Sequence, residues 1–530
     1  MLRGVLTVGG WTMASRILGF MRDMLIAALV GTGPVADAFV VANKLPNLFR
    51  RLFGEGAFNA AFVPEFAGLL HAEGPAAARQ FAQEAIAVMA FWLAGLTIVG
   101  ELFMPQIMVV LAPGFGSDPA KFALAIDLAR ITFPYLMLIC LAALLSGVLN
   151  GMDKFAAAAG APVLYNLFSI AAMLGLTPYV PTVGHALAWG VSASGVVQLA
   201  LLVWAVHRSG MPLHIPRPRL TPRMRLLFRR MTPGLIGASA TQLNSVVDVV
   251  IASLLPAGTV SLLYYADRVQ QLPLGVIGTA VGTAMLPLLS RQVRTGEAGA
   301  AITTLNRAIE YALFLTLPAA LALAVSAFPV MWVLFGRGAF DIESARLSSQ
   351  SLTAYAVGLP AVVLMKVLAP AFFARGDTST PVKVGIITLV INLGLNLALM
   401  VPLQHIGPPL ATSLAAMFNV GALTFMLRRR GQLQPDTELR RRLPRMALAA
   451  AAMGATLWFA QGPLFAGAGQ ARGLKWAALV ALVSLGLTVY IATAHLIGAF
   501  DLRGAVRLLT RRGLRRGGGS AISPAPTPET

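Results

Sequence analysis

The feature that most constrains the fold is a recurrence of apolar runs, each long enough to cross a lipid bilayer. A membrane-spanning helix needs roughly 20 mostly apolar residues, and by this criterion the chain contains about 14 such runs. The sequence therefore predicts an all-α polytopic membrane protein with about 14 transmembrane helices. The runs lie near residues 5–30, 35–66, 80–112, 122–149, 158–180, 184–206, 228–255, 262–290, 305–335, 350–373, 382–402, 408–427, 445–466 and 474–498.

Composition agrees with a membrane protein. The 530 residues are 57% hydrophobic and only 12% charged, whereas soluble domains are roughly 25% charged. The net charge is +20, from 41 Lys and Arg against 21 Asp and Glu. Such an excess would suggest nucleic acid in a soluble protein, but in a membrane protein it indicates basic cytoplasmic loops. We therefore expect no nucleic-acid partner.

The distribution of basic residues predicts the orientation. Loops that follow odd-numbered runs are short and nearly free of Lys and Arg, for example GTGPVAD, APGFGSDP and LPAGT, with Arg337 as the main exception. Loops that follow even-numbered runs are basic, as at Lys154, Arg208 to Arg225, Arg291, Arg375 and Arg428 to Arg442. Because basic loops stay on the cytoplasmic side, we expect a multi-pass protein with both termini in the cytoplasm.

A faint internal duplication predicts the domain organisation. An A-D-x₇-L-P pattern at Asp37 resembles A-D-x₄-L-P at Asp267, and two further pairs of motifs recur at similar offsets, roughly 220 to 230 residues. We expect two six-helix lobes related by a pseudo-twofold axis along the membrane normal. The predicted parts are an N-lobe (1–208), a basic cytoplasmic linker (209–230), a C-lobe (231–430), two additional helices (431–500) and a cytoplasmic tail (501–530) with a disordered Gly/Ser/Pro-rich end.

Ionisable residues inside the apolar runs point to a polar cavity. Each costs several kcal/mol at membrane depth unless it faces water or the protein interior. Arginine stays charged and presents a planar donor fork that suits phosphate. We therefore expect a cationic cavity for an anionic lipid, although snorkelling or ion pairing of the arginines is an alternative. The predicted substrate-binding residues are Arg16, Arg22, Arg50, Arg268 and Asn47.

Four acidic residues lie near these arginines in the sequence. We expect them to pair with an arginine in one conformation and to release it in another, which would make them gating residues. Static pairing that only neutralises the arginines is the alternative. The four acids are Asp23, Asp37, Glu55 and Asp267.

A second polar constellation offers hard oxygen ligands. Asn392 and Asn396 share one face of a helix, and Asp248 and Thr412 would complete a site suited to a small cation such as Na⁺. Hydrogen bonding between helices is the alternative role for these residues.

Enzyme signatures are missing from the sequence. It contains no P-loop, no HExxH motif and no convincing nucleophile with a base. We therefore expect a transporter without a cofactor, driven by the membrane potential or by an ion gradient such as Na⁺. An integral enzyme that acts on polyprenyl phosphates, or a scaffold protein, would be an alternative of a different class.

Several stretches resemble one known family. SRILGFMRD, ADAFVVANKLPNLFRRLFGEGAFNAAFVPEF, YYADRVQQLPLGVIG and KVLAPAFFARGDTSTPVK are similar to helices one, two, eight and ten of the MurJ (MviN) family of bacterial lipid II flippases. The resemblance covers residues 1–430 well and residues 431–530 only by hydropathy. It implies the fold of the multidrug/oligosaccharidyl-lipid/polysaccharide exporters, with two lobes in a V and a lipid-facing groove made by two further helices.

The resemblance also implies a function and its residues. The family moves lipid II, an undecaprenyl-diphosphate-linked peptidoglycan precursor, from the inner to the outer leaflet of the bacterial inner membrane. The family's essential arginines fall on Arg16, Arg22, Arg50 and Arg268, and its essential acid on Asp37, whereas Gln271 replaces an acid found in many members. Expected partners are lipid II, membrane lipids and other proteins of cell-wall synthesis and division. The nearest alternative is a related exporter of another polyprenyl-diphosphate-linked oligosaccharide or of drugs.

Overall fold

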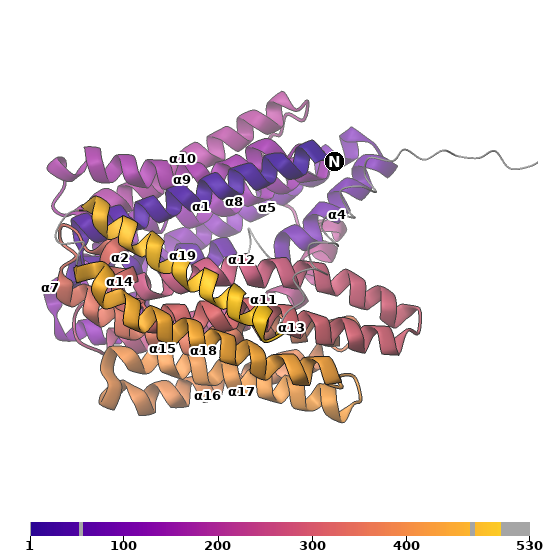
Figure 1. Ribbon diagram of the computed structural model, residues 1–530. Helices are drawn as coiled ribbons and strands as arrows, with labels where there is room; N and C mark the ends of the chain where they lie inside the picture. The colour runs from indigo at the N-terminus through magenta and orange to yellow at the C-terminus, as the bar shows by residue number, and fades with distance from the viewer. Residues whose placement is uncertain (1, 52–56, 467–471, 500–530) are drawn as a thin grey trace, which may run out of the picture.

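The computed structural model describes residues 2–51, 57–466 and 472–499. Within these ranges the chain consists of α-helices and short 3-10 turns, and it contains no strand (Figure 1). The helices are α1 (Leu2–Val30), α2 (Pro34–Ala42), α3 (Lys44–Phe49), α4 (Ala57–Ala72), α5 (Pro75–Leu102), α6 (Met104–Leu111), α7 (Pro119–Thr132), α8 (Tyr135–Gly151), α9 (Phe155–Gly175), α10 (Val183–Arg208), α11 (Pro222–Ser253), α12 (Thr259–Arg294), α13 (Ala298–Val325), α14 (Ala327–Phe335), α15 (Ile342–Phe373), α16 (Ser379–Leu403), α17 (Gly407–Arg429), α18 (Thr437–Ala466) and α19 (Arg472–Leu496).

The helices match the predicted spans one for one. Most spans are a single helix, whereas α2–α3–α4, α5–α6, α7–α8 and α13–α14 each form one interrupted span. Prolines mark two of the interruptions, since Pro105 lies in the first turn of α6 and Pro134 directly precedes α8. Proline costs no helical hydrogen bond at the start of a helix. The prediction of an all-α polytopic protein with about 14 spans is confirmed.

Hydropathy divides the spans into two kinds. In the described residues, nine stretches are long and apolar enough to cross a membrane on length and composition alone. None of them includes α1, α2–α4, α11 or α12, which are the spans that carry most of the ionisable residues singled out above. These spans are expected to face protein or water rather than lipid.

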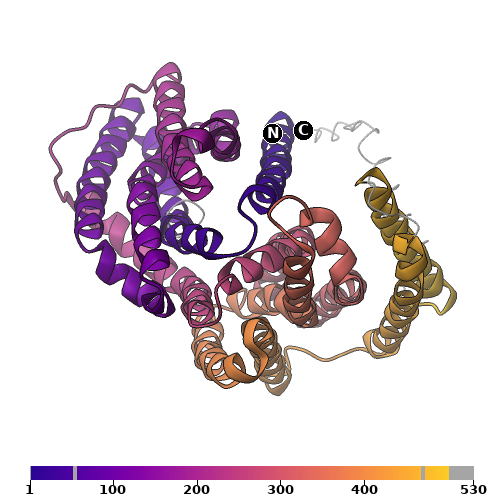
Figure 2. The same cartoon turned by 90° about the vertical axis from the view of Figure 1, so that its left-hand side faces the viewer.

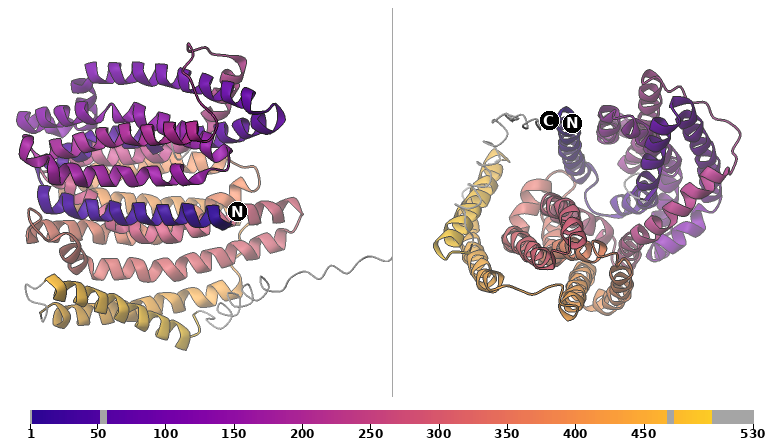
Figure 3. Two further views of the ribbon diagram at one scale, coloured as in Figure 1. Left: turned by 90° about the horizontal axis from the view of Figure 1, so that it is seen from above. Right: turned by 90° about the vertical axis from the view of Figure 1, so that its right-hand side faces the viewer.

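The helices form two groups and an additional pair, as the end-on views in Figures 2 and 3 show. In the first half of the chain α9 packs against α1 and α10, and α8 packs against α4 and α10. In the second half α15 packs against α12, α13 and α17. The pair α18–α19 has its own apolar core and attaches through α13 and α14.

Some predictions about domains stay open. The exact boundaries at 208, 230, 430 and 500 remain predictions. Within the proposed linker, α11 already begins at Pro222. Two predictions, the gating role of Glu55 and disorder at the end of the tail (501–530), concern residues outside the described ranges.

The apolar cores show where the two groups meet. One large cluster combines residues of α2–α10 with Tyr265 and Val269 of α12 and with α14. The second cluster belongs to α12, α13, α15, α16 and α17. Tyr265 of α12 and the helix α14 join the first group near the end of α1 at Val30, which we call the Val30 end. The opposite end, where α1 begins, is called the Leu2 end.

Candidate substrate-binding cavity

A cavity of about 1240 Å³ lies between α1, α3, α4, α8, α9, α10 and α12. Its lining extends along α1 from Val8 to Asp23 and includes Asn150 and Phe155, where α8 ends and α9 begins. The lining thus follows the helices toward the Leu2 end and stops before the Val30 end. The charged residues among the described lining are four arginines and one aspartate, namely Arg16, Arg22, Arg50, Arg268 and Asp23.

The structure therefore brings all four predicted arginines into one cavity. Asn47, the fifth predicted residue, also lines it. With one carboxylate for four guanidinium groups, the described part of the lining carries a net charge of +3. Neutral polar groups complete its walls, among them Ser15, Asn59, Tyr135, Ser146, Asn150, Tyr165, Asn166 and Gln198.

Asp23 joins two of the arginines from different helices. Arg22 Nη2 lies 2.7 Å from Asp23 Oδ1, and Arg268 Nε of α12 lies 3.3 Å from Asp23 Oδ2. Arg22 and Asp23 are only 7% and 4% exposed. Because a single carboxylate faces two guanidinium groups, it neutralises only half of their charge, and the rest remains for a ligand.

Two tyrosines that the sequence analysis missed hold these arginines. Tyr264 donates to Asp23 Oδ1 at 2.9 Å and accepts from Arg268 Nη2 at 3.2 Å. The Arg22 guanidinium lies 5.0 Å from the ring centre of Tyr165, a distance at which a cation attracts an aromatic face. Tyr264 lies one helical turn before Arg268. The i, i+4 spacing of Tyr and Arg in YYADR could have indicated this contact, because such residues share one face of a helix.

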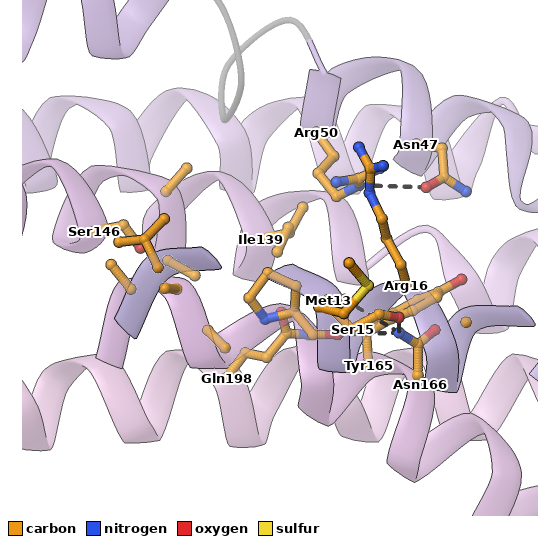
Figure 4. A pocket seen from close by; sticks show the side chains of 18 of the residues that line it. Met13, Ser15, Arg16, Asn47, Arg50, Ile139, Ser146, Tyr165, Asn166 and Gln198 are labelled. Atoms are coloured by element: carbon orange, nitrogen blue, oxygen red, sulfur yellow. Dashed lines mark hydrogen bonds between the residues drawn. The ribbon is translucent and has the colours of Figure 1, made fainter. Parts of the chain in front are cut away.

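The other two arginines lie on opposite sides of the cavity. Figure 4 shows Arg16 of α1 and Arg50, which follows α3, extending toward the same region. Arg50 Nε donates to Asn47 Oδ1 at 3.4 Å, and Asn47 in turn donates to the carbonyl of Asn43 at 2.9 Å. The Arg16 guanidinium packs against Gly275, where an added Cβ would lie 3.3 Å from Arg16 Nη1. Glycine at this position therefore allows Arg16 to approach α12.

Asp37 lies apart from the cavity, at the Val30 end, and its partner is not an arginine. Its fully buried carboxylate pairs with Lys121 Nζ of α7 at 2.7 Å. It also accepts from the backbone N–H of Gly258 (2.7 Å) and Ser261 (2.8 Å) at the start of α12. In this conformation Asp37 pairs with a lysine because α2 packs on α7, and its pairing with an arginine in another conformation stays a prediction. The sequence contained one signal for this partner, because Lys121 is a lone lysine that closely follows the loop APGFGSDP, which is poor in basic residues.

Further contacts close the Val30 end. The Ala339 N–H donates to the Ala28 carbonyl at 2.8 Å, and the Tyr265 hydroxyl donates to the Gly31 carbonyl at 3.0 Å. Thr32 and Ser344 share a 2.6 Å hydrogen bond. Each contact joins the first half of the chain to the second. The structure is thus closed at the Val30 end.

Asp267 does not pair with an arginine in the described structure. Its carboxylate accepts from the side chain of Gln271, one turn further along α12. Gln271 lines the cavity, whereas Asp267 does not belong to the described lining. In this conformation an amide contact with Gln271 takes the place of the pairing expected for Asp267, and its pairing with an arginine in another conformation stays a prediction.

The second predicted constellation does come together from three helices. Asn392 Nδ2 lies 3.3 Å from Thr412 Oγ1, and Asn396 Nδ2 lies 3.0 Å from Asn392 Oδ1. Asp248 of α11 lies 3.5 Å from both Asn396 Nδ2 and Thr412 Oγ1. Asn392 and Asn396 are fully buried. Among the described residues, no group of three or more His, Cys, Asp and Glu side chains forms a metal site.

Comparison with known sequences identifies a family. A model of the family described as Lipid II flippase MurJ matches residues 26–467. A protein of Rhizobium meliloti (strain 1021), named probable lipid II flippase MurJ, is 44% identical over 96% of both chains. A protein of Burkholderia cenocepacia, named lipid II flippase MurJ, is 36% identical over 82% of this chain and 85% of its own length.

Comparison with solved structures agrees on the fold. A structure described as lipid II flippase MurJ, inward closed conformation, has a TM-score of 0.77 at 23% identity and covers 92% of this chain and 98% of its own. An inward-facing multidrug resistance transporter of the MATE family has a TM-score of 0.68 at 15% identity and covers 80% and 97%. These likenesses concern the fold alone. From the family match and the relatives above 30% identity, the chain is a multi-pass membrane protein that belongs to the lipid II flippase MurJ family.

Proposed function

We propose that this chain flips lipid II from the inner to the outer leaflet of the bacterial cytoplasmic membrane by alternating access. The observation that carries the proposal is the convergence of Arg16, Arg22, Arg50 and Arg268 on one cavity, whose described lining contains one carboxylate. A diphosphate-linked head group cannot cross roughly 30 Å of hydrocarbon unaided. A cavity with net positive charge compensates the diphosphate during this crossing.

The arginines suit a diphosphate by geometry as well as charge. A guanidinium offers parallel N–H donors that bind two phosphate oxygens at once. Arg22 and Arg268 are held by one carboxylate and two tyrosine rings, so they lose little freedom when a ligand binds. The neutral Asn, Gln, Ser and Tyr groups of the lining are hydrogen-bonding partners for the sugars and peptide of the head group. The polyprenyl chain stays in the surrounding membrane lipid.

The transport step requires the cavity to open at its other end. With both termini in the cytoplasm, the Leu2 end is cytoplasmic and the closed Val30 end is external. Opening to the outside separates Asp37 from Gly258 and Ser261 and breaks the Ala28–Ala339 contact. Asp37 is therefore a gate residue, while Asp23 and Asp267 respond to the ligand within the membrane.

The energy source is the membrane potential or an ion gradient. Asp248, Asn392, Asn396 and Thr412 fit a Na⁺ ion because each provides an oxygen, and because Asn396 Oδ1 is buried without a hydrogen-bond partner. These oxygens would hold the ion, whose charge then contributes to the balance between the inward and outward conformations. As a transporter the chain needs no catalytic residue, and proteins of cell-wall synthesis and division are its expected neighbours.

Complementation tests this function. Cells depleted of their own lipid II flippase receive the wild-type chain, Arg22→Ala, Arg268→Ala or the control Arg208→Ala, at equal abundance in the membrane. Arg208 lies over the Trp204 ring at the end of α10, outside the described cavity lining. We expect rescue by the wild type and by Arg208→Ala only. Rescue by all four would refute the role of the arginines, and failure of the wild type would refute lipid II as the substrate.

A further inference from the structure

Lys44 connects the two halves of the chain beside the proposed cation site. It is the first residue of α3, and its Nζ donates to Ser245 Oγ of α11 at 2.6 Å. Ser245 precedes Asp248 by three residues, so both lie on the same face of α11. The lysine ammonium group is therefore held within one helical turn of the only carboxylate in the Asp248, Asn392, Asn396 and Thr412 cluster.

The charges around Lys44 leave room for a second cation. Asp267 and Asp248 both attract Lys44, whereas Arg51 and Arg268 repel it. Arg268 already pairs with Asp23. In the ranges that the structure describes, no Lys or Arg nitrogen forms a salt bridge with Asp248, whose hydrogen bonds come from the neutral Asn396 and Thr412. Lys44 thus compensates Asp248 through space, without occupying the oxygen cluster itself.

Lys44 is also attached to the arginine cavity. The preceding residue, Asn43, donates to the Tyr165 hydroxyl at 3.1 Å, and the Tyr165 ring lies against Arg22. One turn later on α3, Asn47 holds Arg50. The short helix α3 therefore contacts α11 through Lys44 at its first residue. Near its last residue it presents Asn47 and Arg50 to the cavity.

We propose that Lys44 is a positioning residue that acts as a tethered competitor of the coupling cation. Its ammonium group, attached to α3, competes with the cation for the negative charge of Asp248. A Na⁺ ion at Asp248 repels Lys44 and weakens its hold on α11, and the release of α3 changes the placement of Asn47 and Arg50. Cation binding and diphosphate binding are then linked through this one helix. The proposal rests on the Na⁺ site of the proposed function.

A purely structural lysine would behave differently. A residue that only joins α3 to α11 affects stability when it is removed, but it leaves the affinity for Na⁺ unchanged. A tethered competitor has the opposite signature, because removing its charge strengthens Na⁺ binding. Because the proposal makes Lys44 the link between the two sites, the same substitution must also abolish the effect of Na⁺ on the diphosphate site and, by reciprocity, the effect of the diphosphate on Na⁺ affinity.

The test uses the full-length protein in lipid nanodiscs. Its thermal unfolding midpoint is titrated with NaCl against choline chloride at constant ionic strength, which gives an apparent Na⁺ affinity. Binding of farnesyl diphosphate, a soluble isoprenyl diphosphate, is then measured in each salt. The variants are Lys44→Met, the charge-conserving Lys44→Arg, Asp248→Asn and, as a matched control, Lys366→Met on the exposed side of α15.

We expect Lys44→Met to bind Na⁺ about 5- to 150-fold more tightly, the usual range for coupled sites. In the wild type, Lys44→Arg and Lys366→Met, Na⁺ should weaken farnesyl diphosphate binding, and this effect should vanish in Lys44→Met and Asp248→Asn. Unchanged Na⁺ affinity in Lys44→Met would overturn the proposal. A wild type that does not distinguish Na⁺ from choline would overturn the Na⁺ site and this inference together, while complementation would still report on lipid II flipping.

Discussion

Asp37 Oδ2 lies 2.7 Å from Lys121 Nζ, and the two side chains are only 1% and 5% exposed. The same carboxylate caps the start of α12 by accepting from the backbone N–H groups of Gly258 and Ser261. A helix N-terminus favours negative charge. The Asp37 carboxylate pairs with Lys121 in the first half of the chain and also binds the backbone of the second half. The Val30 end is thus closed by an ion pair in one half and a helix terminus in the other.

Lys121→Met should shift the protein toward the open conformation at the Val30 end. Removing one partner of a buried ion pair costs about 3–5 kcal/mol, and opening relieves this cost by hydrating Asp37. The measurement is labelling of Thr32→Cys by a membrane-impermeant thiol reagent, with little background because the single native cysteine, Cys140, is buried. We expect labelling at least about 10-fold faster, since 1.4 kcal/mol already gives that factor. Equal rates in Lys121→Met and in the control Lys154→Met, at the opposite end, would contradict the gate.

Gly338→Ala should open the same end by steric pressure. Gly338 has a φ of 58°, and a Cβ at this position would lie 2.1 Å from the Ala28 carbonyl oxygen. The closed contact cannot accommodate it without displacement of α1. Gly376→Ala is the matched control, because its φ is 77° but an added Cβ meets open space. Both variants carry backbone strain, so faster labelling of Thr32→Cys in Gly338→Ala alone isolates the clash.

Arg50→Lys should weaken diphosphate binding although it conserves the charge. Lysine lacks the planar fork of arginine, and a lost hydrogen bond to a charged group costs about 1.5–3 kcal/mol. We expect an approximately 10- to 100-fold weaker affinity for farnesyl diphosphate. Arg208→Lys, outside the described cavity lining, should bind like the wild type. Equal affinities in both variants would show that the cavity senses charge alone.

The sequence was most informative where the signal is local. Apolar run length located the spans, and arginines inside these runs located the cavity. A charged side chain at membrane depth is costly unless it faces water or the protein interior. The Asp248 cluster was also anticipated, since Asn392 and Asn396 lie on one face of a single helix. The spans and the cavity needed only residue type and spacing within one segment, whereas the cluster also needed Asp248 and Thr412 from two other helices.

The partners across the fold could not be predicted in the same way. Lys121 lies 84 residues from Asp37, and their contact depends on the packing of α2 on α7. The N–H groups of Gly258 and Ser261 carry no side-chain signal at all. Lys44 was visible as a charge in an apolar run, but its contact with Ser245 depends on how the two halves meet. Tertiary packing, rather than composition, determines these pairs.

Glu310→Ala should detach the additional helix pair from the second half. The Glu310 carboxylate is fully buried and pairs with Arg307 of α13 and with Arg442 of α18, the latter at 2.6 Å. Its removal leaves Arg307 and Arg442 only the more exposed carboxylates of Asp436 and Glu438, and each lost hydrogen bond to a charged group costs about 1.5–3 kcal/mol. We expect a lower thermal unfolding midpoint in nanodiscs, and faster proteolysis between α17 and α18.

The control for this prediction is Glu343→Ala. Glu343 pairs with Arg346 through side chains that are 54% and 55% exposed, and solvent screens such a pair. Its removal should leave the midpoint unchanged. If Glu310→Ala were as stable as Glu343→Ala, the buried network would contribute nothing to holding α18. The ring contact and the hydrogen bond between Tyr490 and Phe314 would then be sufficient to attach the pair.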